Sequence, residues 1–134
     1  MFLPQLARAE RVAFINLAQL LIKADDKITS QEETFINYYI YEAKLEASDI
    51  DPQAQLDAQL AKLQASSTTV KKIVLVELMA LALTDNEYAD EEQQFMQKIG
   101  TGLGLDDDVI AAALEKTKEF HQAYLELNAF AHQP

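Results

Sequence analysis

The sequence predicts an all-α protein that folds as a single compact helical domain of about six to seven helices. Three glycines and three prolines in 134 residues are too few for a β protein with many turns. Apolar residues recur at steps of three and four through most of the chain, and no stretch shows the alternation of a strand. The third observation is an internal repeat, which predicts a pseudo-two-fold duplication.

The repeat has a period of sixty residues and needs no gap. Five identical pairs carry it: Leu21 and Leu81, Asp25 and Asp85, Glu32 and Glu92, Phe35 and Phe95, Leu45 and Leu105. Two copies are too few for a solenoid, so we expect two related helix pairs that pack on each other. We assign repeat 1 to about residues 8–50 and repeat 2 to about residues 68–110, with a connecting helix at about 51–65 and a C-terminal helix at about 107–132. All belong to one domain, residues 1–134.

The first repeat begins with a helix expected from Pro4 to about Lys23, since proline suits a first helical turn. After an acidic loop, Thr29 or Ser30 offers a cap for the second helix, which ends near Leu45. The buried face of that helix is expected to contain Phe35, Ile36, Tyr39, Ile40 and Ala43. The Asp51-Pro52 pair then predicts the start of the third helix.

The second repeat begins with the most apolar helix, about residues 70–84, which is therefore expected at the centre of the fold. Asp90 is the predicted cap of the fifth helix, whose inner face holds Phe95, Met96, Ile99 and Leu103. The acidic triplet at 106–108 opens the last helix, which we expect to run unbroken to about Ala131.

Composition excludes several classes of function. A formal net charge of −11 opposes nucleic-acid binding, because phosphates need a basic surface. The absence of cysteine excludes disulfides, thiolate nucleophiles and zinc–thiolate sites. The start of the chain lacks the pattern of a signal peptide, and the longest apolar runs, of about eleven residues, are too short for a transmembrane segment. We therefore expect a cytoplasmic protein.

Two acidic segments are the candidate cation site. Residues 25–33 carry a net charge of −3 and residues 85–92 a net charge of −5. Hard oxygen ligands of this kind suit Ca²⁺ or Mg²⁺. Neither segment is an EF-hand, because Ile36 and Met96 stand at the twelfth positions, so a specific site requires both loops to converge. The alternative is that these acids only cap helices and complement helix dipoles.

Three other features are candidates for function. Glu77 is the only charge within the apolar run 73–83, and we expect it at the rim of the fold or paired with Arg8, Arg11 or a ligand. His121 lies at the margin of an apolar stripe, where packing explains it more simply than catalysis. The tyrosines at 38, 39 and 41 suit a partner groove, although helical spacing places Tyr39 on the core face.

Two motifs carry a family resemblance. They are Ala24-Asp25-Asp26-Lys27-Ile28-x-x-x-Glu32 and Asp85-x-x-Tyr88-x-x-x-Glu92. Residues 10–18 before the first motif and residues 41–45 after it fit the resemblance as well. The chain resembles the TerB-like family associated with tellurite resistance over roughly residues 8–110. Asp26 and Asn86 stand where that family usually has glycine, and Tyr88 stands where it has isoleucine.

The resemblance implies a non-enzymatic, pseudo-symmetric helical module that acts in a stress-response assembly. Its proposed divalent-cation or interaction surface corresponds to Asp25, Glu32, Asp85 and Glu92, with Glu42 as a possible addition. The expected partner is a basic protein or a membrane-associated complex. The first alternative is a metal-free interaction scaffold, and a more distant one is a small-pocket enzyme that uses Glu77 or His121.

Overall fold

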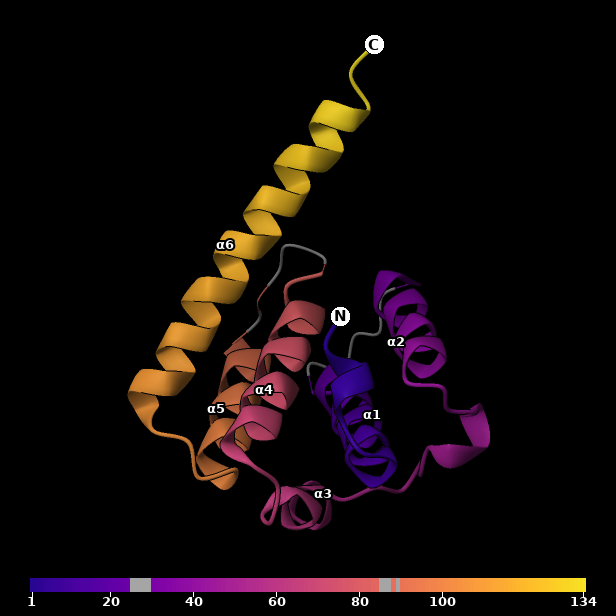
Figure 1. Cartoon of the computed structure of the whole chain (residues 1–134), viewed down its shortest axis with the longest axis vertical. Coiled ribbons are helices and arrows are strands. Elements are labelled where there is room, and N and C mark those ends of the chain that lie inside the picture. The colour runs from indigo at the N-terminus through magenta and orange to yellow at the C-terminus, as the bar shows by residue number, and fades with distance from the viewer. Residues whose placement is uncertain (25–29, 85–87, 89) are drawn as a thin grey trace.

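Helices alone provide the regular structure of the described residues in a computed structural model (Figure 1). The structure describes residues 1–24, 30–84, 88 and 90–134. The α-helices are α1 (Arg8–Ile22), α2 (Ser30–Glu42), α3 (Leu56–Leu63), α4 (Thr68–Ala82), α5 (Asp90–Gly102) and α6 (Asp107–Ala131). Two 3-10 helices are η1 (Leu3–Gln5) and η2 (Ala47–Asp49). No strand occurs in these ranges, so the predicted all-α class is confirmed.

Two helices, α1 and α4, form the centre of the compact bundle. They pack against each other, while α2 and α3 also pack on α1, and α5 and α6 also pack on α4. Figure 1 shows α2 and α6 at opposite edges, with α3 across one end. The apolar sequence of α4 explains its central place, since Val74, Leu75 and Leu78 have no exposed surface.

The helix bounds recur at the sixty-residue period. Both α1 and α4 are 15 residues long, and α2 and α5 are 13 residues long, each pair offset by sixty residues. The exits of the central helices match as well. Ala24 N–H donates to the Leu21 carbonyl over 3.1 Å, and Thr84 N–H donates to the Leu81 carbonyl over 3.2 Å.

The expected helix start at Pro4 is wrong, because α1 begins at Arg8. Pro4 instead lies in η1, which places Leu3 and Leu6 in the core at 0% and 4% exposure. Residues three apart eclipse each other in a 3-10 turn, so this geometry buries both leucines on one side. Leu6 then takes an extended backbone, with ψ of 147°, which separates η1 from α1.

The expected start of the third helix at Asp51-Pro52 is also wrong, because α3 begins at Leu56. Asp51 closes a local turn instead, with its Oδ1 accepting a hydrogen bond from Gln53 N–H over 2.9 Å. Its own N–H donates to Oδ1 of the buried Asn16 over 2.9 Å. Asn16 Nδ2 also donates to Gln59 Oε1 over 3.2 Å, so this side chain joins α1, α3 and the loop between α2 and α3.

The predicted buried face of α2 is confirmed at Ile36, Tyr39 and Ala43 but is wrong at Phe35, which is 39% exposed. Its repeat partner Phe95 is partly buried against the core. The difference follows from position, since α5 also packs on α6, whereas α2 lies at the edge of the bundle (Figure 1).

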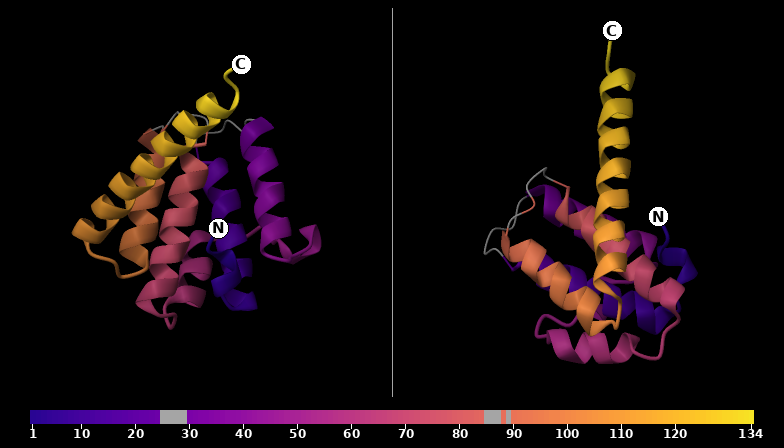
Figure 2. Two further views of the ribbon diagram at one scale, coloured as in Figure 1. Left: turned by 45° about the horizontal axis from the view of Figure 1, so that its top comes forward. Right: turned by 90° about the vertical axis from the view of Figure 1, so that its left-hand side faces the viewer.

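The last helix runs to Ala131, as the sequence predicts. Its first half packs on α4 and α5, and its second half projects beyond the bundle (Figures 1 and 2). None of the helices in the described ranges is both long and apolar enough to cross a lipid bilayer.

Candidate functional site

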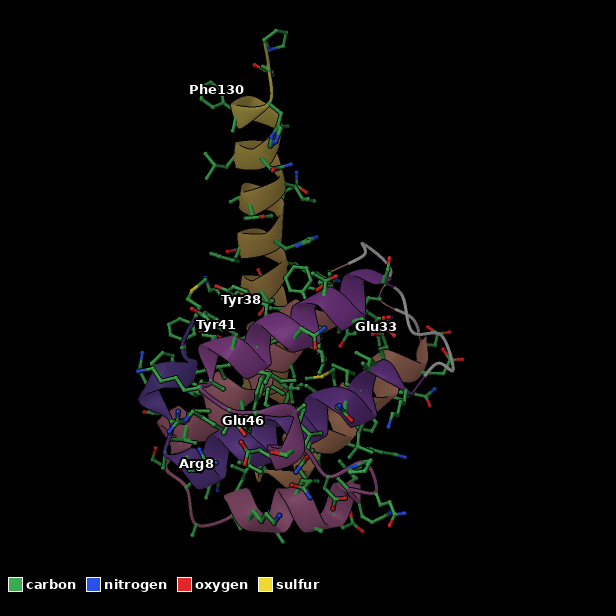
Figure 3. All side chains as sticks on the ribbon, turned by 90° about the vertical axis from the view of Figure 1, so that its right-hand side faces the viewer. Arg8, Glu33, Tyr38, Tyr41, Glu46 and Phe130 are labelled. Carbon is green, nitrogen blue, oxygen red and sulfur yellow. The ribbon has the colours of Figure 1, made fainter. Side chains whose placement is uncertain are left out.

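Two of the four predicted cation ligands lie in the described residues. Glu32 is in the first turn of α2 and Glu92 is in the first turn of α5, and each is only 3% exposed. Figures 2 and 3 place these two helix starts on the same side of the molecule. The other two predicted ligands, Asp25 and Asp85, lie outside the described residues.

The burial of both glutamates needs a physical reason, because a carboxylate loses hydration energy when it leaves water. The free N–H groups and positive dipole end of the first helical turn favour a negative charge at this point. Each glutamate already has an interaction within the fold. Their immediate neighbours Glu33 and Glu91 are exposed, so the repeat places one acid inward and one outward at each helix start.

The negative charge of Glu92 affects the pKa of a neighbouring side chain, Tyr88. Burial, and after it the negative charge of Glu92, raises the pKa of Tyr88 to about 12. The phenol therefore stays protonated at neutral pH beside the Glu92 carboxylate. A protonated phenol can donate a hydrogen bond to an acidic or oxygen-bearing ligand.

The predicted ligand set Asp25, Glu32, Asp85 and Glu92 stays a prediction. In residues 1–24, 30–84, 88 and 90–134, no group of three or more Asp, Glu or His side chains is arranged to hold a metal ion. The two aspartates that the proposed site requires lie outside these ranges.

Glu42 and Glu77 form a second acidic pair, and the sequence did not predict that these two residues lie together. Glu77 on α4 and Glu42 on α2 both form ion pairs with the terminal ammonium of Met1, and the ammonium lies 3.1 Å from Glu77 Oε1. Phe2 N–H also donates to Glu77 Oε1 over 2.8 Å. Of the expected places for Glu77, an ion pair is therefore correct, but its partner is not an arginine.

The two arginines have other partners. Arg8 forms an ion pair with Asp49 over 2.9 Å, and Arg11 donates to the Ala43 carbonyl over 2.6 Å. The sequence signal for the actual arrangement was the single acid in the apolar run of α4. Nothing in local spacing shows that a group 75 residues earlier in the chain reaches it.

Burial and the charges of Glu42 and Glu77 shift the pKa values of two neighbouring groups, the Met1 ammonium and the Tyr39 phenol. Burial lowers the pKa of the Met1 ammonium, but the hydrogen bond to Glu42 and the charge of Glu77 outweigh it and raise that pKa above 8.0. Burial and the same two carboxylates raise the pKa of Tyr39. Tyr39 lies edge-on to Phe14, with ring centroids 5.5 Å apart, so this acidic pair borders the core.

Two surface hollows that described residues line bear on the enzyme alternative. One hollow of about 220 Å³ lies between α4, α5 and α6 and is lined by Met79, Tyr88, Met96 and Ile110 among others. A more open one of about 390 Å³ lies between α3 and α5. Neither of these two is lined by Glu77 or His121, the residues of the enzyme alternative.

No family model, no curated protein and no solved structure matches the chain.

Proposed function

We propose that the protein is a non-enzymatic, acidic helical module of the TerB-like type, which binds a divalent cation weakly and docks a protein partner in a stress-response assembly. One observation carries the proposal. Glu32 and Glu92 are both buried in the first turns of equivalent helices, and each belongs to an acidic segment of the sequence.

The duplication that relates these glutamates is part of the proposal. Its support is the sixty-residue offset between the bounds of α1 and α4 and between those of α2 and α5. The packing partners follow the same relation, because α2 and α3 lie against α1 as α5 and α6 lie against α4. A duplication would place the loops that precede α2 and α5 in related positions about an approximate two-fold axis.

The cation follows from the donor set. Four carboxylates, Asp25, Glu32, Asp85 and Glu92, would supply hard oxygen ligands, which Ca²⁺ and Mg²⁺ prefer. A net charge of −11 raises the local concentration of any cation.

Titration with Ca²⁺ or Mg²⁺, followed by heteronuclear NMR, tests the cation. A shared site predicts that amides near Asp25 and Asp85 shift together and saturate with one binding constant. The double variant Glu32→Gln/Glu92→Gln should abolish the saturable shifts. The matched control Glu33→Gln/Glu91→Gln removes the same charge from exposed neighbours and should keep them. Shifts that are absent, or equal in both double variants, would show non-specific screening and end the cation proposal.

One observation favours the metal-free scaffold as a second candidate. Phe35, Tyr38 and Tyr41 are 39%, 59% and 82% exposed and recur on one side of α2. Figure 3 shows Tyr38 and Tyr41 near the start of the chain. Aromatic side chains at a surface are typical of protein interfaces. This candidate predicts partner binding that persists when a chelator removes divalent cations and is lost in Tyr38→Ser/Tyr41→Ser.

A further inference from the structure

The distal half of α6 carries an apolar stripe that nothing in the described part of the structure covers. The stripe consists of Phe120, Tyr124, Leu127 and Phe130, which are 53%, 57%, 66% and 71% exposed. Steps of four, three and three residues keep these side chains on one side of the helix. Figure 3 shows Phe130 at the far end of α6, away from the bundle.

The stripe continues a pattern that is buried in the first half of the same helix. Ile110 and Thr117 are 6% and 7% exposed against the bundle. From Ile110 the steps alternate between three and four residues through Ala113, Thr117, Phe120, Tyr124, Leu127 and Ala131. This is the spacing of a coiled-coil seam, so the distal half of α6 has the pattern of a helix that packs on another helix.

We propose that this stripe is a homodimer interface, in which the distal halves of α6 from two copies pair antiparallel about a two-fold axis between Tyr124 and Leu127. The order of side chains supports this arrangement. In it Tyr124 of each copy lies against Leu127 of the other, and Phe120 lies against the small Ala131. Ala123 provides space beside Phe130. Because each aromatic side chain of the stripe meets a smaller side chain of the other copy, the surface is complementary to itself, as an isologous interface must be.

The distal half of α6 carries little charge, which favours self-association at this part of the molecule. Residues 120–134 contain one formal charge, Glu126, whereas the whole chain has a net charge of −11. Two copies would repel each other through most of their surfaces, and least where the distal halves of α6 meet.

Charge also disfavours a lipid surface as the occupant. Helices that lie on membranes carry lysine and arginine on their polar face. The polar side of the distal half of α6 instead carries Glu119 and Glu126, with Lys118 as its one lysine and no arginine. An anionic bilayer would therefore repel this helix as well as the acidic bundle behind it.

The exposed area is sufficient for a weak dimer. At roughly 150–250 Å² per large side chain, the four residues leave about 450 Å² of apolar surface on each copy. Their small and polar neighbours bring the area to about 600 Å² per copy, the lower end of specific interfaces. Area alone does not set affinity, but a small interface with few anchoring side chains lies at the weak end of the range, so we expect a dissociation constant on the order of 10 μM.

Sedimentation velocity of the full chain, at concentrations below and above that value, tests the proposal. The wild type should convert from monomer to dimer. Leu127→Glu should weaken the dimer at least about tenfold, because it places two carboxylates beside the axis. Gln122→Glu adds the same charge on the opposite side of α6 and should leave the dimer unchanged. Tyr41→Ser removes an even more exposed aromatic side chain, on α2 and outside the stripe, and should also leave the dimer unchanged. Circular dichroism checks that each variant keeps its helices.

Orientation is measured separately. The chain has no cysteine, so a single introduced cysteine can carry one spin label per copy. At 1.5 Å per residue, antiparallel pairing places the two Gln122→Cys labels about 10 Å apart along the helix axis and the two Lys116→Cys labels about 28 Å apart. Equal separations at both positions would indicate parallel pairing and overturn the proposed axis.

Three results would overturn the homodimer itself. They are a chain that stays monomeric at every concentration, a dimer that Leu127→Glu leaves intact, and a monomer that floats with vesicles of anionic lipid. The last result would assign the stripe to a membrane surface instead.

Discussion

Lys44 and Gly104, sixty residues apart, share the left-handed backbone conformation, with φ of 56° and 80°. Each directly precedes a leucine whose N–H reaches back over the end of a helix. Leu45 N–H donates to the Ile40 carbonyl and Leu105 N–H donates to the Gly100 carbonyl, both over 3.0 Å. The ends of α2 and α5 are therefore closed by the same Schellman-type cap, but only the second uses the residue that suits it.

This difference predicts opposite effects at the two positions. Lys44→Gly should stabilise the fold by about 0.5–1 kcal/mol, because glycine relieves the left-handed strain of a side chain. Gly104→Ala should destabilise it by about 1 kcal/mol through the backbone alone, since a Cβ there meets no atom within 4 Å. Urea unfolding of both variants measures the two changes. Changes of the same sign would contradict the shared cap.

Gly100 allows α6 to approach α5 closely. A Cβ at this position would lie 2.5 Å from Cδ1 of Ile110. We expect Gly100→Ala to destabilise the fold by up to about 2 kcal/mol, because overpacking costs about 1–3 kcal/mol and helix propensity returns about 1 kcal/mol.

The effect of Gly100→Ala on the free energy of unfolding should change sign when Ile110 is truncated. In the Ile110→Ala background, Gly100→Ala should be neutral or stabilising, since only the propensity term remains. A double-mutant cycle by urea unfolding measures the coupling between the two positions. If the cost of Gly100→Ala is the same in both backgrounds, Ile110 is not the cause.

The Met1 ammonium predicts a loss of stability in mildly alkaline solution. Its folded pKa is above the ordinary value of 8.0 because of Glu42 and Glu77, in spite of burial. A group with a raised folded pKa stabilises the fold fully below its unfolded value, and this contribution disappears as the pH rises through the folded value. Urea unfolding of an untagged chain between about pH 7 and pH 10 should show the decline.

Variants of the acidic pair separate this ammonium from other titrating groups. Glu77→Gln keeps an oxygen that can accept from Phe2 N–H but removes the charge, so it should flatten the decline. Glu46→Gln, at an exposed acid outside this pair, is the charge-matched control and should keep the decline. An equal decline in both variants would assign the effect to another group.

Tyr88 predicts a second effect at higher pH. Its folded pKa is about 12 rather than 10.0 because of burial and Glu92. Only the unfolded chain ionises this phenol between these values, so the free energy of unfolding should fall as the pH rises through them. Tyr88→Phe should remove this component. Ultraviolet absorbance of tyrosinate provides the direct measurement, and Glu92→Gln should lower the pKa of Tyr88 only in part, because burial remains.

The sequence predicts the helices better than their first residues. Periodicity places α4 at the centre and carries α6 to Ala131 because both depend on which side chains are apolar. Pro4 and Asp51-Pro52 carry genuine start signals, but the same signals also suit turns. Burial of Leu3 and the hydrogen bond from Asp51 to Asn16 stabilise turns rather than helix starts at these positions. Both interactions depend on residues that are distant in the sequence.

The candidate site was likewise predictable only where it depends on the sequence pattern, and not where it depends on contacts between distant residues. The recurrence of Glu32 and Glu92 is visible in the sequence, and so is the anomaly of Glu77 in an apolar helix. The inward orientation of the two glutamates and the pairing of Glu77 with Met1 arise only from packing. Exposure of Phe35 could not be read from its repeat partner, because the repeat does not show which helix lies at an edge.

The ion pairs of Met1 have a practical consequence for recombinant protein. A tag fused ahead of this residue replaces the ammonium with a neutral peptide group, so Glu42 and Glu77 would lose their counter-ion beside the core. Fusion proteins of that design should melt earlier than a chain that begins at Met1, and cleavage that leaves even one extra residue would displace the amine from its two glutamates.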